Sequence, residues 1–221
     1  MADGYVGHFH FWRTGQQINP VDAKVSGQFG DLAIKLQSIL LIGNPAEKNG
    51  EPVNKEYAWL HMVAYTIATP PPFQKDVFVA NQFTQQEQWT LGSPELLLVP
   101  AFKVLQPPPP PDPPKEGPHF LCYRVTKFPN AVPGPVTISD QFQKKDVTSL
   151  QPRYLGVPVD KNGEGIKNPE AHLLCYTAKG AKGQPKHVRQ TGVHINNQIG
   201  VSVFGTTKES ELCIPSLKTL P

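Results

Sequence analysis

Four histidines recur at equivalent places, and they are the side chains in this sequence best suited to chemistry. His8, His61, His119 and His172 each begin a unit of histidine, three mostly apolar residues and an aromatic. His10 would share a strand face with His8, and imidazoles two residues apart on a strand can supply two metal ligands. A transition-metal site is therefore one hypothesis. The other is structural, with one histidine per unit bonded to a neighbouring turn backbone.

A second set of candidate ligands lies in the segment Asp160–Gly165, which reads Asp-Lys-Asn-Gly-Glu-Gly. Calcium loops alternate oxygen-bearing side chains and use a glycine at the sixth place for a sharp turn. Asp160, Asn162 and Glu164 would supply the oxygens. The twelfth place, where a bidentate glutamate is expected, is Ala171. The segment is thus either a calcium site or a plain Asn-Gly turn.

Tryptophans are the candidates for a ligand platform, because exposed aromatic rings present a large apolar surface to carbohydrate or other polymers. Trp12, Trp59 and Trp89 all lie in the first half of the chain. The alternative is that these rings fill a core. Both hypotheses remain open from the sequence.

Other catalytic chemistry finds little support. The sequence contains no Gly-x-Ser-x-Gly elbow, no glycine-rich phosphate loop and no His-Glu-x-x-His motif. We therefore predict no catalytic residue and no cofactor, with calcium or a transition metal as the ions left open. The net charge of +3 is small and the basic residues are scattered, which argues against a nucleic-acid partner.

No stretch approaches the roughly 20 apolar residues that a membrane-spanning helix needs. The N-terminal residues Met1–Tyr5 lack the basic and apolar regions of a signal peptide. We expect a soluble chain without a membrane span, either intracellular or an exported form whose signal has been removed or replaced.

Two further motifs recur four times downstream of the histidines. A glutamine motif occupies Ser26–Phe29, Ala80–Phe83, Ser139–Phe142 and Asn196–Ile199. An apolar run then leads into proline and lysine, ending at Lys48, Lys103, Lys161 and Lys218. The same interval separates His8 from His61 and His119 from His172. The chain is therefore built from four similar units.

The units predict an all-β protein. The 25 prolines disfavour long helices, and segments such as Val136–Ser139 alternate apolar and polar residues between turn-forming residues. We interpret Leu32–Leu41 as a strand as well. The predicted organisation is two tandem sandwich- or barrel-like domains. They are residues 1–105 (halves 8–58 and 61–105) and residues 119–221 (halves 119–169 and 172–221), joined by a proline-rich linker at 106–118.

The linker contains the run Pro107–Pro111. Consecutive prolines adopt an extended helix of about 3.1 Å per residue, so the segment would be a semi-rigid spacer of roughly 40 Å. We expect it to hold the two domains apart.

The pattern His-x-x-Cys-Tyr, Asp-Gln-Phe and Leu-Cys-x-Pro-x-x-Lys is clearest from His119 to Lys218. It resembles an uncharacterised family of secreted bacterial proteins in which this unit recurs in tandem with a cysteine at each end. The resemblance covers nearly the whole chain and implies no particular activity. The chain departs from the pattern, because only the last unit keeps both cysteines, Cys175 and Cys213.

If the units are stapled as the family pattern implies, Cys175 and Cys213 face each other on neighbouring strands and form a disulfide. The alternative is a pair of free buried thiols. Cys122 would then be a small buried apolar residue in a strand. A disulfide would place the protein in an oxidising setting, extracellular or periplasmic.

These observations favour a non-catalytic extracellular binding or surface-structural protein, since repeated modules suit attachment to an extended polymer or surface ligand. Exposed strand edges would also permit self-assembly into fibres. The alternative function is a metal-dependent enzyme that uses the opening histidines. An enzyme requires one concave site whose residues break the repeat symmetry, whereas a binding or assembly protein does not.

Overall fold

The protein is almost entirely β-strand, as the sequence predicts, and the expected strand Leu32–Leu41 is present. The computed structural model describes residues 7–128, 135–148 and 150–221, so Met1–Tyr5, where we expect no signal peptide, lies outside them. A short 3-10 turn, η1, spans Lys55–Tyr57. The strands are β1 (His8–Gly27), β2 (Gly30–Lys48), β3 (His61–Ile67), β4 (Lys75–Ala80), β5 (Glu87–Val104), β6 (His119–Lys127), β7 (Val136–Ser139), β8 (Lys144–Thr148), β9 (Pro152–Lys161), β10 (His172–Thr177), β11 (Lys179–Gly180), β12 (Val193–Asn197), β13 (Gly200–Phe204) and β14 (Lys208–Thr219).

Eight of the strands in the described residues close into an antiparallel barrel. Each pairs with two neighbours, in the order β1, β2, β3, β5, β6, β9, β10, β14 and back to β1. We call the four units repeats 1 to 4, residues 8–58, 61–105, 119–169 and 172–221. Each repeat contributes its opening strand and its closing strand to the wall. The first and last repeats meet where β1 pairs with β14.

A β-hairpin separates the two barrel strands of each repeat, and the glutamine motif lies at its turn. Asn81, Asp140 and Asn197 precede the glutamine, and the Oδ1 atom of each accepts the backbone N–H groups two and three residues later. Such a turn gives backbone donors a partner. Gly27 holds this place in repeat 1, where a Cβ atom would lie 2.9 Å from the Val159 side chain.

Each hairpin folds back onto the repeat two places away in the ring. The end of β1 pairs with β9 and β7 pairs with the end of β2, which joins repeats 1 and 3 in both directions. β4 pairs with the end of β14 and β12 with the end of β5, which joins repeats 2 and 4. The aromatics of the opening motifs hold the same partners: Trp12 with Asp140, Tyr65 with Asn197, Tyr176 with Asn81, and Tyr123 with Phe29. Opposite repeats therefore lock each other.

The barrel interior contains cross-strand pairs of complementary size. The residues directly opposite each other are Phe11 and Gly43, Ala64 and Leu98, Cys122 and Gly156, and Cys175 and Cys213. A larger side chain faces a smaller one in the first three repeats. A Cβ atom on Gly43 would lie 2.6 Å from the Phe11 ring, so that ring fills the space a side chain would need.

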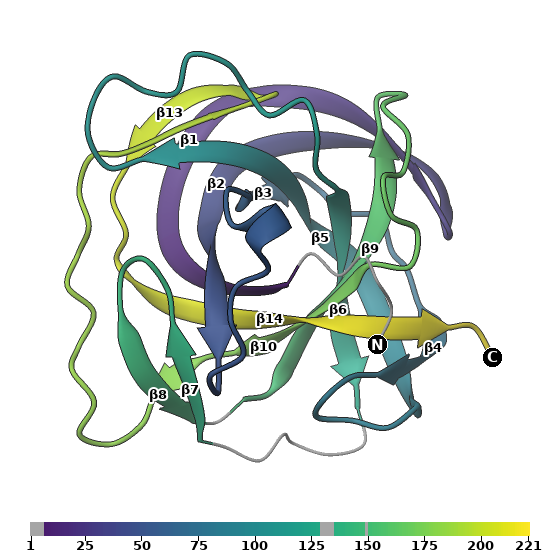
Figure 1. The fold of residues 1–221 in the computed structure, drawn as a ribbon. Helices are drawn as coiled ribbons and strands as arrows, with labels where there is room; N and C mark the ends of the chain where they lie inside the picture. The colour runs from purple at the N-terminus through teal and green to yellow at the C-terminus, as the bar shows by residue number, and fades with distance from the viewer. Residues whose placement is uncertain (1–6, 129–134, 149) are drawn as a thin grey trace.

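The predicted disulfide between Cys175 and Cys213 is confirmed, with a sequence separation of 38. Cys122 is a buried free thiol whose pKa is raised by that burial. All eight barrel strands contribute side chains to the interior cluster around these cysteines. The connection between repeats 1 and 2 adds Leu60 to this cluster, with Tyr57 and Trp59 packed beside it. Figure 1 shows η1, in blue, surrounded by the strands.

The structure corrects the predicted division into domains 1–105 and 119–221. The strands of both segments belong to one sheet, and β5 pairs directly with β6 across the expected boundary. The repeats assigned to one domain, 1 and 2, also exchange hairpins with repeats 3 and 4. The reason is physical: one half of the ring would leave the edges of β1 and β5 unpaired, and closing the barrel removes these edges.

The proline-rich segment 106–118 is a return loop, which corrects the predicted spacer. It connects β5 to the neighbouring antiparallel strand β6, so the chain turns back along the barrel wall and does not lead away to a separate domain. The Asn196 side chain donates to the Pro110 carbonyl at 2.9 Å. A Cβ atom on Gly117 would lie 2.9 Å from the Pro100 ring. The segment therefore packs on the barrel that it connects.

Replacing Cys175 and Cys213 together by alanine should lower the free energy of unfolding by on the order of 3 to 4 kcal/mol, because the bridge restricts the unfolded chain. The control is Cys122→Ala, which removes a buried thiol without breaking a bridge and should cost on the order of 1 kcal/mol. Urea unfolding measures both. Equal losses per cysteine would contradict a stabilising role for the bridge.

Candidate functional site

The opening histidines of repeats 2 and 4 bond to the backbone just before them. His61 Nδ1 lies 2.9 Å from the Trp59 carbonyl oxygen, and His172 Nδ1 lies 3.2 Å from that of Glu170. Burial lowers the pKa of His61 to about 3 and that of His172 to about 4, so both rings are neutral near pH 7. These contacts match the structural hypothesis for the repeated histidine.

His8 and His119 belong to two matching polar clusters. In the first, Lys48 lies 3.1 Å from Glu51, Gln82 of the next repeat donates to Glu51 at 2.8 Å, and His8 Nε2 lies 3.5 Å from the same carboxylate. The second has the same composition: His119, Lys161, Glu164 and Gln198. The Lys-Asn-Gly-Glu loops, Lys48–Glu51 and Lys161–Glu164, therefore each contact the glutamine motif of the next repeat.

The structure does not gather the candidate transition-metal ligands into one site. His8 and His119 lie in the two polar clusters, and His61 and His172 contact backbone carbonyls. His10 lies in a separate network described below. Among the described residues, no group of three or more His, Cys, Asp or Glu side chains is arranged to hold a metal ion.

The candidate calcium loop is an Asn-Gly turn that holds a hairpin. Asn162 adopts a left-handed φ of 57°, its Oδ1 accepts the N–H of Lys24 at 2.8 Å, and its own N–H donates to the Lys24 carbonyl at 2.9 Å. Glu164 pairs with Lys161, and Asp160 Oδ1 is buried with no hydrogen-bond partner in the described residues. Two of the three candidate calcium ligands therefore already bind protein groups.

The tryptophans do not form an exposed platform. Trp12 is fully buried and Trp89 is 2% exposed, both within the main apolar cluster. Trp59 is half-buried and lies 5.3 Å, between ring centroids, from Phe102. The core-filling alternative accounts for Trp12 and Trp89.

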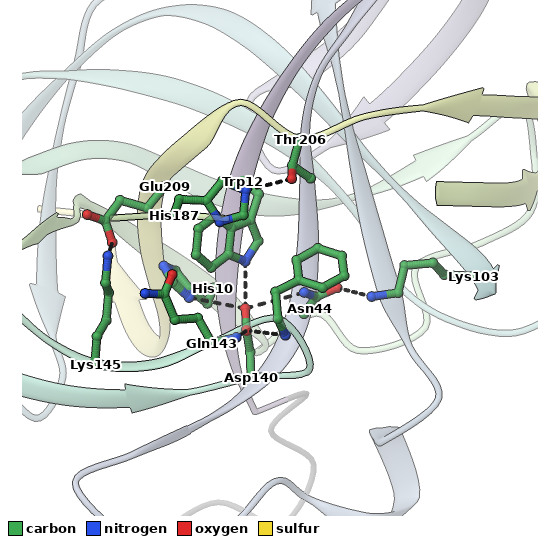
Figure 2. A network of polar contacts seen from close by, with 11 residues as sticks. His10, Trp12, Asn44, Lys103, Asp140, Gln143, Lys145, His187, Thr206 and Glu209 are labelled. Atoms are coloured by element: carbon green, nitrogen blue, oxygen red, sulfur yellow. Dashed lines mark hydrogen bonds and ion pairs between the residues drawn. The ribbon is translucent and has the colours of Figure 1, made fainter. Parts of the chain in front are cut away.

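One polar network breaks the repeat symmetry, and Asp140 is at its centre (Figure 2). Asp140 Oδ2 accepts Trp12 Nε1 at 2.6 Å and Asn44 Nδ2 at 3.3 Å, and lies 3.1 Å from His10 Nδ1. Lys103 extends the network by donating to Asn44 Oδ1. Burial raises the pKa of Asp140, but the contacts with His10 and Trp12 outweigh it and hold the pKa below its usual value.

The network arises because repeat 1 has polar residues where the other repeats have apolar ones. His10 lies opposite Asn44 in the ladder of β1 and β2. The equivalent cross-strand pairs are Val63 with Val99, Leu121 with Val157, and Leu174 with Ile214. Comparing the four repeats in the sequence would have revealed this exception, which the search for metal and calcium motifs missed.

The ring of His187 lies beside Trp12 in the network (Figure 2). The His187 ring stacks on Trp12 at 4.1 Å between centroids, and its Nε2 lies 2.7 Å from Thr206 Oγ1. His10 and Asp140 side chains have no exposed surface. Burial also lowers the pKa of Lys103 to about 7. The buried contacts of Asp140 with Trp12, Asn44 and His10 fasten hairpin β7–β8 to repeat 1.

Glu211 is a further buried acidic residue that the sequence analysis missed. It is 2% exposed and faces Phe11 across β1 and β14. Burial raises its pKa to about 7, although Arg153 lies 2.9 Å away and opposes that rise. The equivalent residues of the other repeats are Leu41, Leu96 and Tyr154, so Glu211 also departs from the repeat pattern.

Two adjoining hollows run along the β1–β2 hairpin and form a surface groove. They measure about 480 and 540 Å³, and Lys24, Ala33 and Asn162 line both. Their other polar lining residues include Ser26 and Asp31 near the turn and Asp22 and Lys35 farther along. We call this the hairpin groove. It is open to solvent, and both positively and negatively charged side chains line it.

The sequence model of a family described as a repeat of unknown function (DUF7450) matches residues 57–215, which is more than half of the chain. No curated protein and no solved structure matches it. The matched span contains repeats 2 and 3 and repeat 4 as far as residue 215, whereas His10, Trp12 and Asn44 lie before it. Within the described residues, no helix is long and apolar enough to cross a membrane.

His172→Asn should flatten the acid dependence of stability, because asparagine keeps an amide donor for the Glu170 carbonyl and does not titrate. The lowered pKa of His172 means that the unfolded chain binds a proton between pH 6.5 and about 4 that the folded chain does not. The wild type should therefore lose on the order of 3 kcal/mol relative to the variant as the pH falls through that window. Urea unfolding across pH 4–7 measures this difference, and parallel curves would refute it.

Asp140→Ala should cost more stability than Asn197→Ala, its matched control in repeat 4. Both remove the acceptor of two backbone N–H groups and of an aromatic side chain, but only Asp140 is a buried charge. We expect losses on the order of 3 to 5 kcal/mol for Asp140→Ala and about 1 to 3 kcal/mol for Asn197→Ala. Denaturant unfolding measures the loss in the free energy of unfolding for each variant. Equal losses would show that the buried charge of Asp140 contributes no additional stability.

Proposed function

We propose that this chain, which belongs to the DUF7450 family of repeats of unknown function, is a non-catalytic extracellular binding protein. Its ligand is an extended polar polymer, such as a polysaccharide, and its binding surface is the hairpin groove. The groove is the single observation that carries this proposal, because it is elongated, open and lined by hydrogen-bonding side chains.

The chemistry of the lining supports a polar polymer. Lys24 and Lys35 carry hydrogen-bond donors, Asp22 and Asp31 carry acceptors, and Ala33 lies among them. Lys35 lies 3.7 Å from Asp22 and Ser26 donates to Asp31, and both carboxylates keep further lone pairs for a ligand. Strands rise about 3.3 Å per residue, so the lined stretch of β1 from Asp22 to Ser26 extends roughly 13 Å. That length accommodates two or three sugar units and lets a longer chain continue at both ends.

The remaining polar groups support binding over catalysis. The repeated histidines, the glutamines of the motifs that contact them and Asp140 all have partners within the protein. His61 and His172 contact adjacent backbone, Gln82 and Gln198 contact the neighbouring repeat, and Asp140 fastens a hairpin to the opposite repeat. The disulfide Cys175–Cys213 supports an extracellular location, because such bonds persist in oxidising compartments.

Ala33→Trp should block the groove and abolish polymer binding, because Ala33 is exposed and lines both hollows. Gln37→Trp is the matched control, since Gln37 is exposed on the same strand and outside the lining. Affinity electrophoresis in gels containing dextran or polygalacturonate measures retardation, which we expect for the wild type and the control with at least one polymer. Equal retardation of all three proteins, or none with either polymer, would contradict the proposal.

A further inference from the structure

In the part of the chain that the structure describes, three of the four junctions between neighbouring repeats are bridged by backbone pairing. At each, the second hairpin strand of one repeat pairs with the segment that follows the opening motif of the next. The bridging pairs are Leu36 with Ile67, Thr90 with Lys127, and Thr148 with Lys179. The outer strand ladder therefore continues from repeat 1 through repeat 4.

The fourth junction, between repeat 4 and repeat 1, is open. β13 pairs with β12 and ends the sheet order in the described residues. β1 meets this part of the chain at one point, where Thr207 N–H donates to the Arg13 carbonyl at 2.8 Å. A hollow of about 310 Å³ separates the strands beyond it, lined by residues 16–19 of β1 and 199–202 around the start of β13, with Tyr65 and Val21. We call it the seam groove.

Both walls of the seam groove present unpaired strand edges. β1 pairs with β14 only up to Arg13 and with β9 only from Val25, so the edge between them is open within the described residues. In β13, the turn-closing pair is Asn197 with Gly200. Backbone groups alternate in direction along an antiparallel strand, so those of Val201 and Val203 point away from β12. Their side chains are 54% and 48% exposed.

We propose that the seam groove binds an extended peptide strand from another polypeptide, which pairs with β13 and continues the outer ladder. Continuity with the three bridged junctions favours this occupant. At each of them the free edge of the hairpin strand pairs with an extended segment of the next repeat, and the peptide would give β13 the pairing partner that this junction lacks within the described residues. Val201 and Val203 favour a peptide with apolar β-branched residues at alternate positions. This site shares no lining residue with the hairpin groove, and it adds a protein partner to the proposed polymer ligand.

Fluorescence anisotropy with a labelled, acetylated Thr-Val-Thr-Val-Thr-Lys peptide tests the proposal. The control peptide carries N-methyl groups on alternate amides, which removes its hydrogen bonds without changing its side chains. Val203→Pro removes an N–H that faces the groove and leaves the β12–β13 ladder intact, whereas Val203→Thr keeps that N–H. Thermal unfolding of both variants verifies that they fold.

We expect the wild type and Val203→Thr to bind the peptide within twofold of each other, with at least tenfold weaker binding by Val203→Pro and by the N-methylated peptide. No binding by the wild type, or equal binding of both peptides, would overturn the proposal. The peptide comparison decides even if Val203→Pro fails to fold. Sedimentation velocity supplies a further outcome. If the wild type dimerises and Val203→Pro abolishes dimerisation, the proposal of a different polypeptide is overturned, and the occupant of the seam groove is a second copy of this chain. Polymer binding in the gels tests the hairpin groove separately, so its outcome does not depend on the peptide experiments.

Discussion

The pairing of β1 with β14 closes the barrel, and the rest of the structure depends on this closure. Without it, both strands would expose a long unpaired edge, and the interior pairs at Phe11 and Cys213 would face solvent. Closure also brings repeats 1 and 3, and repeats 2 and 4, to opposite positions. The hairpin exchanges between them follow, so no repeat has a complete set of partners by itself.

Buried polar side chains do the fastening between opposite repeats. Asn81, Asp140 and Asn197 each satisfy two backbone donors of a hairpin turn and also contact an aromatic hydroxyl or indole of the opposite repeat. Burying such groups costs free energy unless every donor and acceptor finds a partner. The turn therefore fits in one position relative to the opposite strand, which gives the apolar packing its register.

Repeat 1 is where the chain departs furthest from its own pattern. It has His10 and Asn44 where the other repeats have an apolar cross-strand pair, and Asp140 of repeat 3 packs against these two residues. It also carries the longest hairpin, which lines the hairpin groove, and its opening strand forms one wall of the seam groove. The surfaces available to partners thus gather around the one repeat that precedes the matched family span.

The sequence by itself predicted four repeats and an all-β protein, which follow from periodicity and turn chemistry acting over a few residues. The resemblance to a family with a cysteine at each end of its unit implied the disulfide between Cys175 and Cys213, with free buried thiols as the alternative. The structure showed that the glutamine motifs lie at hairpin turns. Only the tertiary structure decided that the repeats close into one barrel, that residues 106–118 return between neighbours, and that Asp140 meets His10. The pairing of β1 with β14 and the contact of His10 with Asp140 join residues more than a hundred positions apart, and the return of residues 106–118 depends on which strand β6 pairs with. No local pattern encodes which strand edge a hairpin or a strand will reach.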